Sequence, residues 1–261
     1  MISRSANYIQ RGFRGVRTRL AEWQLPPTAR AVRRERLTYL SPEKLKRLEH
    51  TLVAVLARGV PGDVLEFGVA LGGSAIVLAK HASRERRAFH GFDVFGMIPP
   101  PTSERDDAKS RQRYEVIATG QSKGIRGDTY YGYRKDLLEE VQASFARHGV
   151  PVDGETVVLH KGLFQETWPS YGDRAIVFAH IDCDWYEPVK FCLERVASRL
   201  SPGGAIVLDD YHDYGGCRVA TDEFLAAHRE FTFEDGANVF LKRSDRPDRS
   251  EFSSAVASQG I

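Results

Sequence analysis

The sequence predicts an α/β fold in which a mostly parallel sheet carries helices on both faces. Short apolar runs, such as 63–67 and 175–181, alternate with segments of helical periodicity. Several of these runs end in acids, as expected where the carboxyl ends of parallel strands form a ligand-binding edge. Two closely spaced apolar runs, at 231–233 and 238–241, predict an antiparallel strand pair at one edge of the sheet.

The composition is that of an ordinary globular protein with one sizeable core: 42% of the 261 residues are hydrophobic and 28% are charged. The formal net charge of +2 does not by itself indicate a nucleic-acid partner. Cys183, Cys192 and Cys217 form no CxxC pair, which suits a reducing compartment. No stretch approaches the ~18 apolar residues of a membrane span, and the N-terminus lacks the apolar core of a signal peptide. We therefore expect a cytoplasmic protein with no membrane partner.

Residues 1–40 are assigned to a basic N-terminal extension. Nine arginines and two acids fall within residues 1–36. A helix is predicted at about 8–23, and Pro26-Pro27 ends it. Basic arms can bind nucleic acid, a membrane surface or an acidic neighbouring subunit. We favour oligomerisation or a lid as the role of this arm.

One domain is expected over residues 41–243. Ser41-Pro42-Glu43 supplies an N-cap, a first-turn proline and a first-turn acid, so a helix begins there and runs to about Ala57. Residues 96–130 are rich in proline, glycine and charge, and they predict a long loop or lid. Residues 244–261 are polar and predict a disordered tail. Besides the strands already named, we expect strands at 88–93, 156–160 and 205–208, and helices at 75–79, 134–148, 188–200 and 217–229.

Carboxylates follow two neighbouring strands of the predicted sheet. Asp182 and Asp184 come after strand 175–181, and Asp209-Asp210 end strand 205–208. Clustered carboxylates repel one another, so a cation is their natural partner. Ligands that are all oxygens favour a hard ion such as Mg2+. A single acid here could simply cap a helix start, but the group predicts a metal site. Asp184 could be a fourth ligand, although we favour a role in capping the next helix.

A glycine loop joins the first strand to the next helix. Gly68 and Gly72-Gly73-Ser74 follow Glu66, and glycines let a ligand approach the backbone closely. Asp93 ends the second strand 25 residues after Gly68, where an acid can reach ribose hydroxyls. The loop does not match the G-x-G-x-x-G of dinucleotide enzymes. Glu66 would repel a pyrophosphate but attract a cationic ligand such as S-adenosylmethionine.

These motifs resemble the macrocin O-methyltransferase family, metal-dependent enzymes that methylate sugar hydroxyls in macrolide and aminocoumarin biosynthesis. The resemblance covers about residues 41–243. It implies a Rossmann-like class I methyltransferase fold with a seven-stranded sheet. The matching segments are Pro61-Gly62-Asp63-Val64-Leu65-Glu66-Phe67-Gly68-Val69, Gly72-Gly73-Ser74, Gly91-Phe92-Asp93, Asp182-x-Asp184-x-Tyr186-Glu187, Ser201-Pro202-Gly203-Gly204 and Asp209-Asp210-Tyr211. Cys183 departs from the family, which often has glycine there, and Trp185 is bulkier than expected.

The resemblance also implies roles for individual residues. Asp182, Asp209 and Asp210 fall on the family's ligands for Mg2+ or another divalent cation, and Asp182 doubles as the proposed base. His212, just past the acidic pair, is a second catalytic candidate, whereas His180 is expected to be buried beside the site. The implied cofactor-binding residues for S-adenosylmethionine are Glu66, Gly68, Gly72, Ser74 and Asp93, with Gly162 and Phe164 near the adenine. The implied reaction methylates a sugar hydroxyl of a glycosylated natural product or saccharide, in a homo-oligomer.

Two alternatives remain open at this stage. Catechol-type methyltransferases use similar metal chemistry on phenols, but they usually carry lysine and asparagine where this chain has Trp185 and Asp210. A non-catalytic protein with the same fold could instead use the arginine-rich arm to bind RNA or a partner protein. The intact set of cofactor and metal acids argues against that second alternative.

Overall fold

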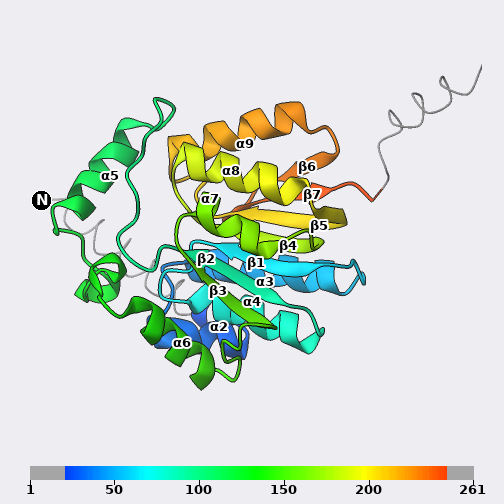
Figure 1. Cartoon of the computed structure of the whole chain (residues 1–261), viewed down its shortest axis with the longest axis horizontal. Coiled ribbons are helices and arrows are strands. Elements are labelled where there is room, and N and C mark those ends of the chain that lie inside the picture. Colours follow the sequence, from blue (N-terminus) through cyan, green and yellow to red (C-terminus); the bar gives the residue numbers. More distant parts are fainter. Residues whose placement is uncertain (1–20, 246–261) are drawn as a thin grey trace, which may run out of the picture.

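The computed structural model describes residues 21–245. Within them, seven strands form one sheet in the order β3-β2-β1-β4-β5-β7-β6 (Figure 1). The first five strands pair in parallel, and β7 runs antiparallel to both β5 and β6. The predicted α/β fold with an antiparallel C-terminal edge is thereby confirmed. The strands are β1 (Asp63–Phe67), β2 (Phe89–Asp93), β3 (Val157–Lys161), β4 (Ile176–Ile181), β5 (Leu200–Leu208), β6 (Phe231–Glu234) and β7 (Val239–Arg243).

Helices cover both faces of the sheet (Figure 1). One face carries α2 (Pro27–Arg34), α3 (Pro42–Leu56), α4 (Gly73–Arg84) and α6 (Leu137–Arg147). The opposite face carries α7 (Phe164–Thr167), α8 (Tyr186–Ala197) and α9 (Gly215–Ala227). Each face has its own buried apolar cluster, so the sheet is the central layer of three. No helix among residues 21–245 is long and apolar enough to cross a membrane.

Helix α3 begins and ends as the sequence predicts. The Ser41 side chain accepts a hydrogen bond from the Lys44 N–H at 3.2 Å, and Pro42 occupies the first turn. Leucines at the expected spacing bury one stripe of the helix. The Lys44 side chain, by contrast, leaves the helix toward the carboxyl edge of the sheet.

Part of the segment assigned to the N-terminal extension belongs to the core. Helix α2 starts at Pro27, whose fixed φ suits a first helical position. Leu25, Ala29 and Val32 are buried in the same cluster as α3 and α4. In the sequence, the proline pair predicts only the end of a helix, so the sequence analysis does not predict α2. The helix predicted at 8–23 lies almost entirely outside the described residues, as does the tail from residue 246 onward.

Residues 96–130 were predicted to be a long loop or lid. The structure shows that they contain helix α5 (Ala108–Ala118). The Asp107 carboxylate caps this helix by accepting a hydrogen bond from the Ser110 N–H at 2.7 Å. Only Ser110 and Ile117 of the helix are buried. With so small an apolar face, the helix carries no periodic pattern that sequence analysis could detect.

Candidate active site

A cavity of about 650 Å3 opens at the carboxyl edge of the sheet. Its lining includes residues that directly follow or end four neighbouring strands: Gly68 after β1, Asp93 of β2, Asp182 after β4 and Asp209 after β5. Helix α5 and the segment before α3 supply further wall. The two groups of residues singled out in the sequence, the glycine loop and the acids, therefore meet in one cavity.

Three carboxylates form a tight group in this cavity. One oxygen each of Asp182, Asp184 and Asp210 lies within 4.8 Å of the other two. Oxygens this close together can all bind one cation. Asp184 sits in a left-handed conformation, with φ +58°, and its N–H donates to the Asp210 carboxylate at 3.2 Å.

The prediction that Asp184 caps the next helix is wrong. The N-cap position of α8 is Trp185, and no side chain of that residue caps the helix. The Tyr186 N–H instead donates to the Asp106 carboxylate at 2.9 Å. Because Asp106 from the distant 96–130 segment accepts this hydrogen bond, the Asp184 carboxylate is left to join the acidic group.

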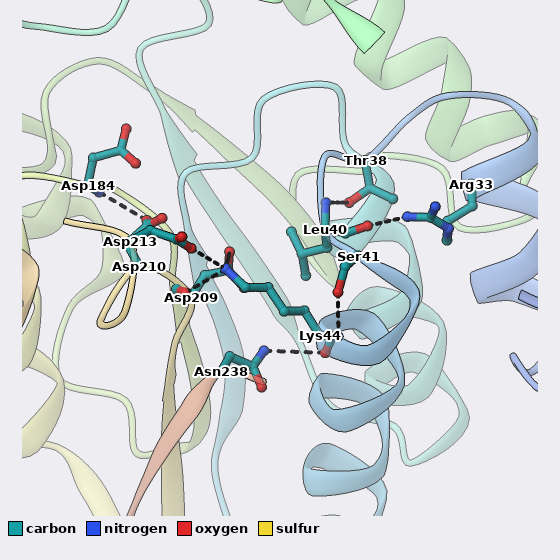
Figure 2. Close-up of polar contacts among 10 residues, drawn as sticks. All are labelled: Arg33, Thr38, Leu40, Ser41, Lys44, Asp184, Asp209, Asp210, Asp213 and Asn238. Carbon is teal, nitrogen blue, oxygen red and sulfur yellow. Dashed lines mark hydrogen bonds and ion pairs between the residues drawn. The ribbon is translucent and has the colours of Figure 1, made fainter. Parts of the chain in front are cut away.

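Asp209 is held differently from the other acids (Figure 2). The Lys44 ammonium lies 2.9 Å from its Oδ2 and 2.9 Å from its backbone oxygen. The same ammonium donates to Asp213 Oδ2 at 2.7 Å. The other oxygen of Asp209, Oδ1, is buried and has no hydrogen-bond partner among residues 21–245. A buried carboxylate oxygen without a partner is costly, so it points to a missing ligand.

The electrostatics of the acidic group favour a bound cation. Burial, and after it repulsion from Asp209 and Asp210, raises the pKa of Asp182 well above its usual value. Burial and the neighbouring Asp210 do the same for the pKa of Asp184. For Asp210, burial and Asp209 raise the pKa to about 6. Charging these groups without a cation is therefore unfavourable, and their all-oxygen chemistry fits a hard divalent ion.

The other side of the cavity is formed by backbone. Gly68 has φ +93°, and a Cβ there would lie 1.9 Å from the carbonyl oxygen of Asp182. No side chain fits at that position. The Asp93 carboxylate accepts hydrogen bonds from the Ala70 N–H at 2.9 Å and the Phe95 N–H at 2.6 Å, and it lines the cavity beside Phe164.

Four of the predicted cofactor-binding residues do not line the cavity. Glu66 is fully buried, and its Oε1 lies 2.7 Å from Nδ1 of His180, which is also fully buried, as expected for that histidine. Gly72 and Ser74 start α4, and Gly162 donates its N–H to the backbone oxygen of Asp93 at 2.9 Å. None of the four is among the cavity-lining residues.

His212 also lies away from the cavity lining. Its side chain is 41% exposed, and Nε2 lies 2.8 Å from the Asp235 carboxylate. The turn after β5 directs the histidine to the surface, although the acids just before it face the cavity. Of the two candidate bases, Asp182 lines the cavity and His212 does not.

Several cavity residues gave no signal in the sequence. Lys44 comes from α3, and Lys109 and Arg113 come from α5. The Lys109 ammonium lies 4.8 Å from the ring centre of Tyr214, and the Arg113 guanidinium lies 5.6 Å from that of Tyr130. Each belongs to a segment remote in sequence from the acids, so no local pattern connects them to the site.

Comparison with known proteins agrees with this geometry. The family model for macrocin-O-methyltransferase (TylF) matches residues 27–234. The chain is 30% identical over 226 residues to an 8-demethyl-8-(2,3-dimethoxy-alpha-L-rhamnosyl)-tetracenomycin-C 4'-O-methyltransferase of Streptomyces olivaceus, covering 82% of this chain and 78% of that protein. It is 29% identical over 217 residues to mycinamicin III 3''-O-methyltransferase of Micromonospora griseorubida, covering 79% and 78% of the two chains.

Solved structures show the same fold. The O-methyltransferase NovP superposes with a TM-score of 0.64 at 24% sequence identity, over 80% of this chain and 82% of that one. The fold is thus that of the class I O-methyltransferases. The matched family model spans most of the chain and includes both the glycine loop and the acids. The chain belongs to the macrocin O-methyltransferase family and is an O-methyltransferase.

Proposed function

We propose that the enzyme transfers the methyl group of S-adenosylmethionine to a sugar hydroxyl of a glycosylated small molecule, with the help of a divalent cation such as Mg2+. One observation carries this proposal: Gly68 of the glycine loop and the acidic group line one and the same cavity. Both relatives are named as O-methyltransferases, one of mycinamicin III and the other of a tetracenomycin that carries a rhamnosyl group.

The wall formed by Gly68 and Asp93 would hold the cofactor. The absence of a side chain at Gly68 lets the methionine part lie against the backbone. Two backbone N–H groups fix the Asp93 carboxylate, which leaves further lone pairs on its oxygens for ribose hydroxyls. Phe164 offers an apolar surface for the adenine. Glu66 does not line the cavity, so it would influence the cofactor site indirectly, through its contact with His180.

The acidic group would hold the cation. The proposed ligands are Asp182, Asp209 and Asp210. Asp184 is a fourth candidate, supported by its close grouping with Asp182 and Asp210. A bound divalent cation lowers the pKa of a coordinated hydroxyl and fixes its direction. Asp182 lines the same cavity as Gly68 and Asp93, and its carboxylate would take the proton of a hydroxyl held beside the cofactor. Alignment of the two reactants would supply much of the rate.

Calorimetry with S-adenosylmethionine and with Mg2+ tests the cofactor site and the metal site separately. Mass spectrometry of glycosylated metabolites incubated with labelled cofactor tests the reaction. We expect S-adenosylmethionine to bind and a sugar oxygen to become methylated in a cation-dependent way. Failure of the cofactor to bind would contradict the proposal, as would methylation of phenolic oxygens alone. The homo-oligomer expected from the resemblance belongs to the same proposal, and sedimentation equilibrium measures it.

A further inference from the structure

Lys44 is anchored at the edge of the acidic group by its own helix. Ser41 caps α3 at the Lys44 N–H, and the Asn238 side chain donates to the Lys44 carbonyl at 3.3 Å (Figure 2). The next residue, Leu45, is fully buried in the core. Because the backbone is held on both sides, the side chain reaches the acids from a fixed starting point.

The Lys44 ammonium has no donor left over. A lysine ammonium has three N–H donors and no acceptor. Its three acceptors are Oδ2 of Asp209, the backbone oxygen of Asp209 and Oδ2 of Asp213. Three contacts with the two acidic residues therefore fix the position of the ammonium beside Asp209.

This contact makes the two oxygens of Asp209 unequal. Oδ2 is occupied by the ammonium, whereas Oδ1 is buried and has no hydrogen-bond partner in the described part of the chain. Asp209 is 6% exposed, so water does not readily satisfy Oδ1. In this state Oδ1 is the oxygen that Asp209 offers most readily to a cation, because Oδ2 is already paired with a positive charge.

We infer that Lys44 is a positioning residue that makes Asp209 a one-oxygen ligand and thereby sets which divalent cation the site prefers. The inference rests on the proposed metal site. Mg2+ requires near-octahedral geometry with ligands at about 2.0–2.1 Å, and it gains little from a carboxylate that binds through both oxygens. Ca2+ accepts six to eight ligands and readily takes both oxygens of one carboxylate. By pairing its positive charge with Oδ2, Lys44 disfavours the two-oxygen binding mode that suits Ca2+.

A simpler role for Lys44 is to offset negative charge. Loss of one positive charge strengthens the binding of any divalent cation, and it changes the affinities for Mg2+ and Ca2+ in the same direction. The ratio of the two affinities separates the roles, because a change in how Asp209 binds acts mainly on Ca2+.

Lys109 provides a matched control. It also lines the cavity, but its ammonium donates to the backbone oxygen of Asp213 and stacks on Tyr214 without contacting Asp209. Lys109→Met therefore removes the same charge from the same cavity. It leaves the hydrogen bonds of Asp209 in place.

Calorimetric titration of the full-length protein with MgCl2 and with CaCl2 tests the inference on the wild type, Lys44→Met and Lys109→Met. We expect Lys44→Met to shift the affinity ratio toward Ca2+ by about tenfold, the lower end of the effect of residues that orient metal ligands. Lys109→Met should keep the wild-type ratio. Equal ratios in all three proteins would overturn the inference and leave the proposed function intact.

Two further outcomes are decisive. If neither ion binds the wild type, the proposed metal site falls, and the inference falls with it. Circular dichroism and thermal unfolding show whether each variant is folded. Lys44→Gln, which keeps a polar group but is shorter and uncharged, replaces Lys44→Met if the apolar side chain prevents folding. It is expected to shift the ratio in the same direction, and an unshifted ratio would count against the role of Lys44.

Discussion

Backbone groups at the ends of β1 and β2 shape the part of the cavity that we propose holds the cofactor, the cofactor side. Side chains from α3, α5 and the loops around them shape the rest of its wall, the proposed acceptor side. Gly68 and the N–H groups around Asp93 are fixed by the sheet itself. The acceptor side depends on single polar contacts, such as that between the Trp185 Nε1 and the Pro99 carbonyl oxygen at 3.0 Å. Substitutions should therefore damage folding on the first side and acceptor binding on the second.

The largest effect is expected where the two sides meet, at Asp182. Asp182→Asn removes the proposed base and a proposed cation ligand together, so kcat should fall by at least about 100-fold. Asp173→Asn changes an exposed carboxylate that contacts Arg199 outside the cavity, and its kcat should match the wild type. Initial rates at saturating cofactor measure both. Wild-type turnover in Asp182→Asn would contradict the assignment.

Substitution of one glycine on each side allows a direct comparison of the loss in unfolding free energy. Gly68→Ala forces a Cβ to within 1.9 Å of a backbone oxygen, and the position also has φ +93°. We expect a loss of about 3 kcal/mol or more in the free energy of unfolding. Gly120, just after α5, has φ +75°, and a Cβ there would meet nothing within 4 Å, so Gly120→Ala should cost about 1 kcal/mol. Urea unfolding of both variants measures the difference, and equal losses would contradict the contrast.

The sheet itself should also lose stability in mild acid. Burial, and then the charges of Arg174 and His160, lowers the pKa of His90 in β2 to about 3. An unfolded histidine titrates near pH 6.5, so between about pH 6.5 and 3 the unfolded chain binds more protons at this residue. Stability from neutral His90 is therefore fully present above pH 6.5 and is lost as the pH falls toward 3.

The expected slope from His90 is at most about 1.4 kcal/mol per pH unit within that window. Urea unfolding at pH 7.5, 6.0 and 5.0 measures it, and His90→Gln isolates it from other titrating groups. The variant should show a shallower fall in unfolding free energy than the wild type. Parallel curves for the two proteins would show that His90 is not kept neutral by the fold.

The smallest effect is expected on the acceptor side. Trp185→Phe keeps an aromatic ring beside Tyr214 but removes the donor to the Pro99 carbonyl. One hydrogen bond of about 1 kcal/mol predicts a KM for the acceptor that is about fivefold higher. The dissociation constant of S-adenosylmethionine, measured by calorimetry, should not change. A weakened cofactor affinity with an unchanged acceptor KM would contradict the assignment of Trp185 to the acceptor side.

The difference between strand-end groups and side chains from remote segments also explains how much of the site the sequence could predict. Strands and the acids behind them were predictable because buried apolar runs and the residues that follow them are local patterns. The strand-end residues Gly68 and Asp93 were found in this way. The contact of Lys44 with Asp209 joins residues 165 positions apart, and the pairing of Glu66 with His180 joins residues 114 apart. Such contacts follow from strand order and helix docking, which no local pattern specifies.

The proposed mechanism requires a divalent cation among the acids, beside the methyl group of the cofactor. Mn2+ is paramagnetic, so it broadens the NMR signals of nearby nuclei and can replace Mg2+ as a probe. The methyl signal of S-adenosylmethionine bound to the wild-type enzyme should broaden strongly when Mn2+ is added, and the broadening should be lost in Asp210→Asn. Equal broadening in both proteins, or none in the wild type while the cofactor is bound, would contradict the account.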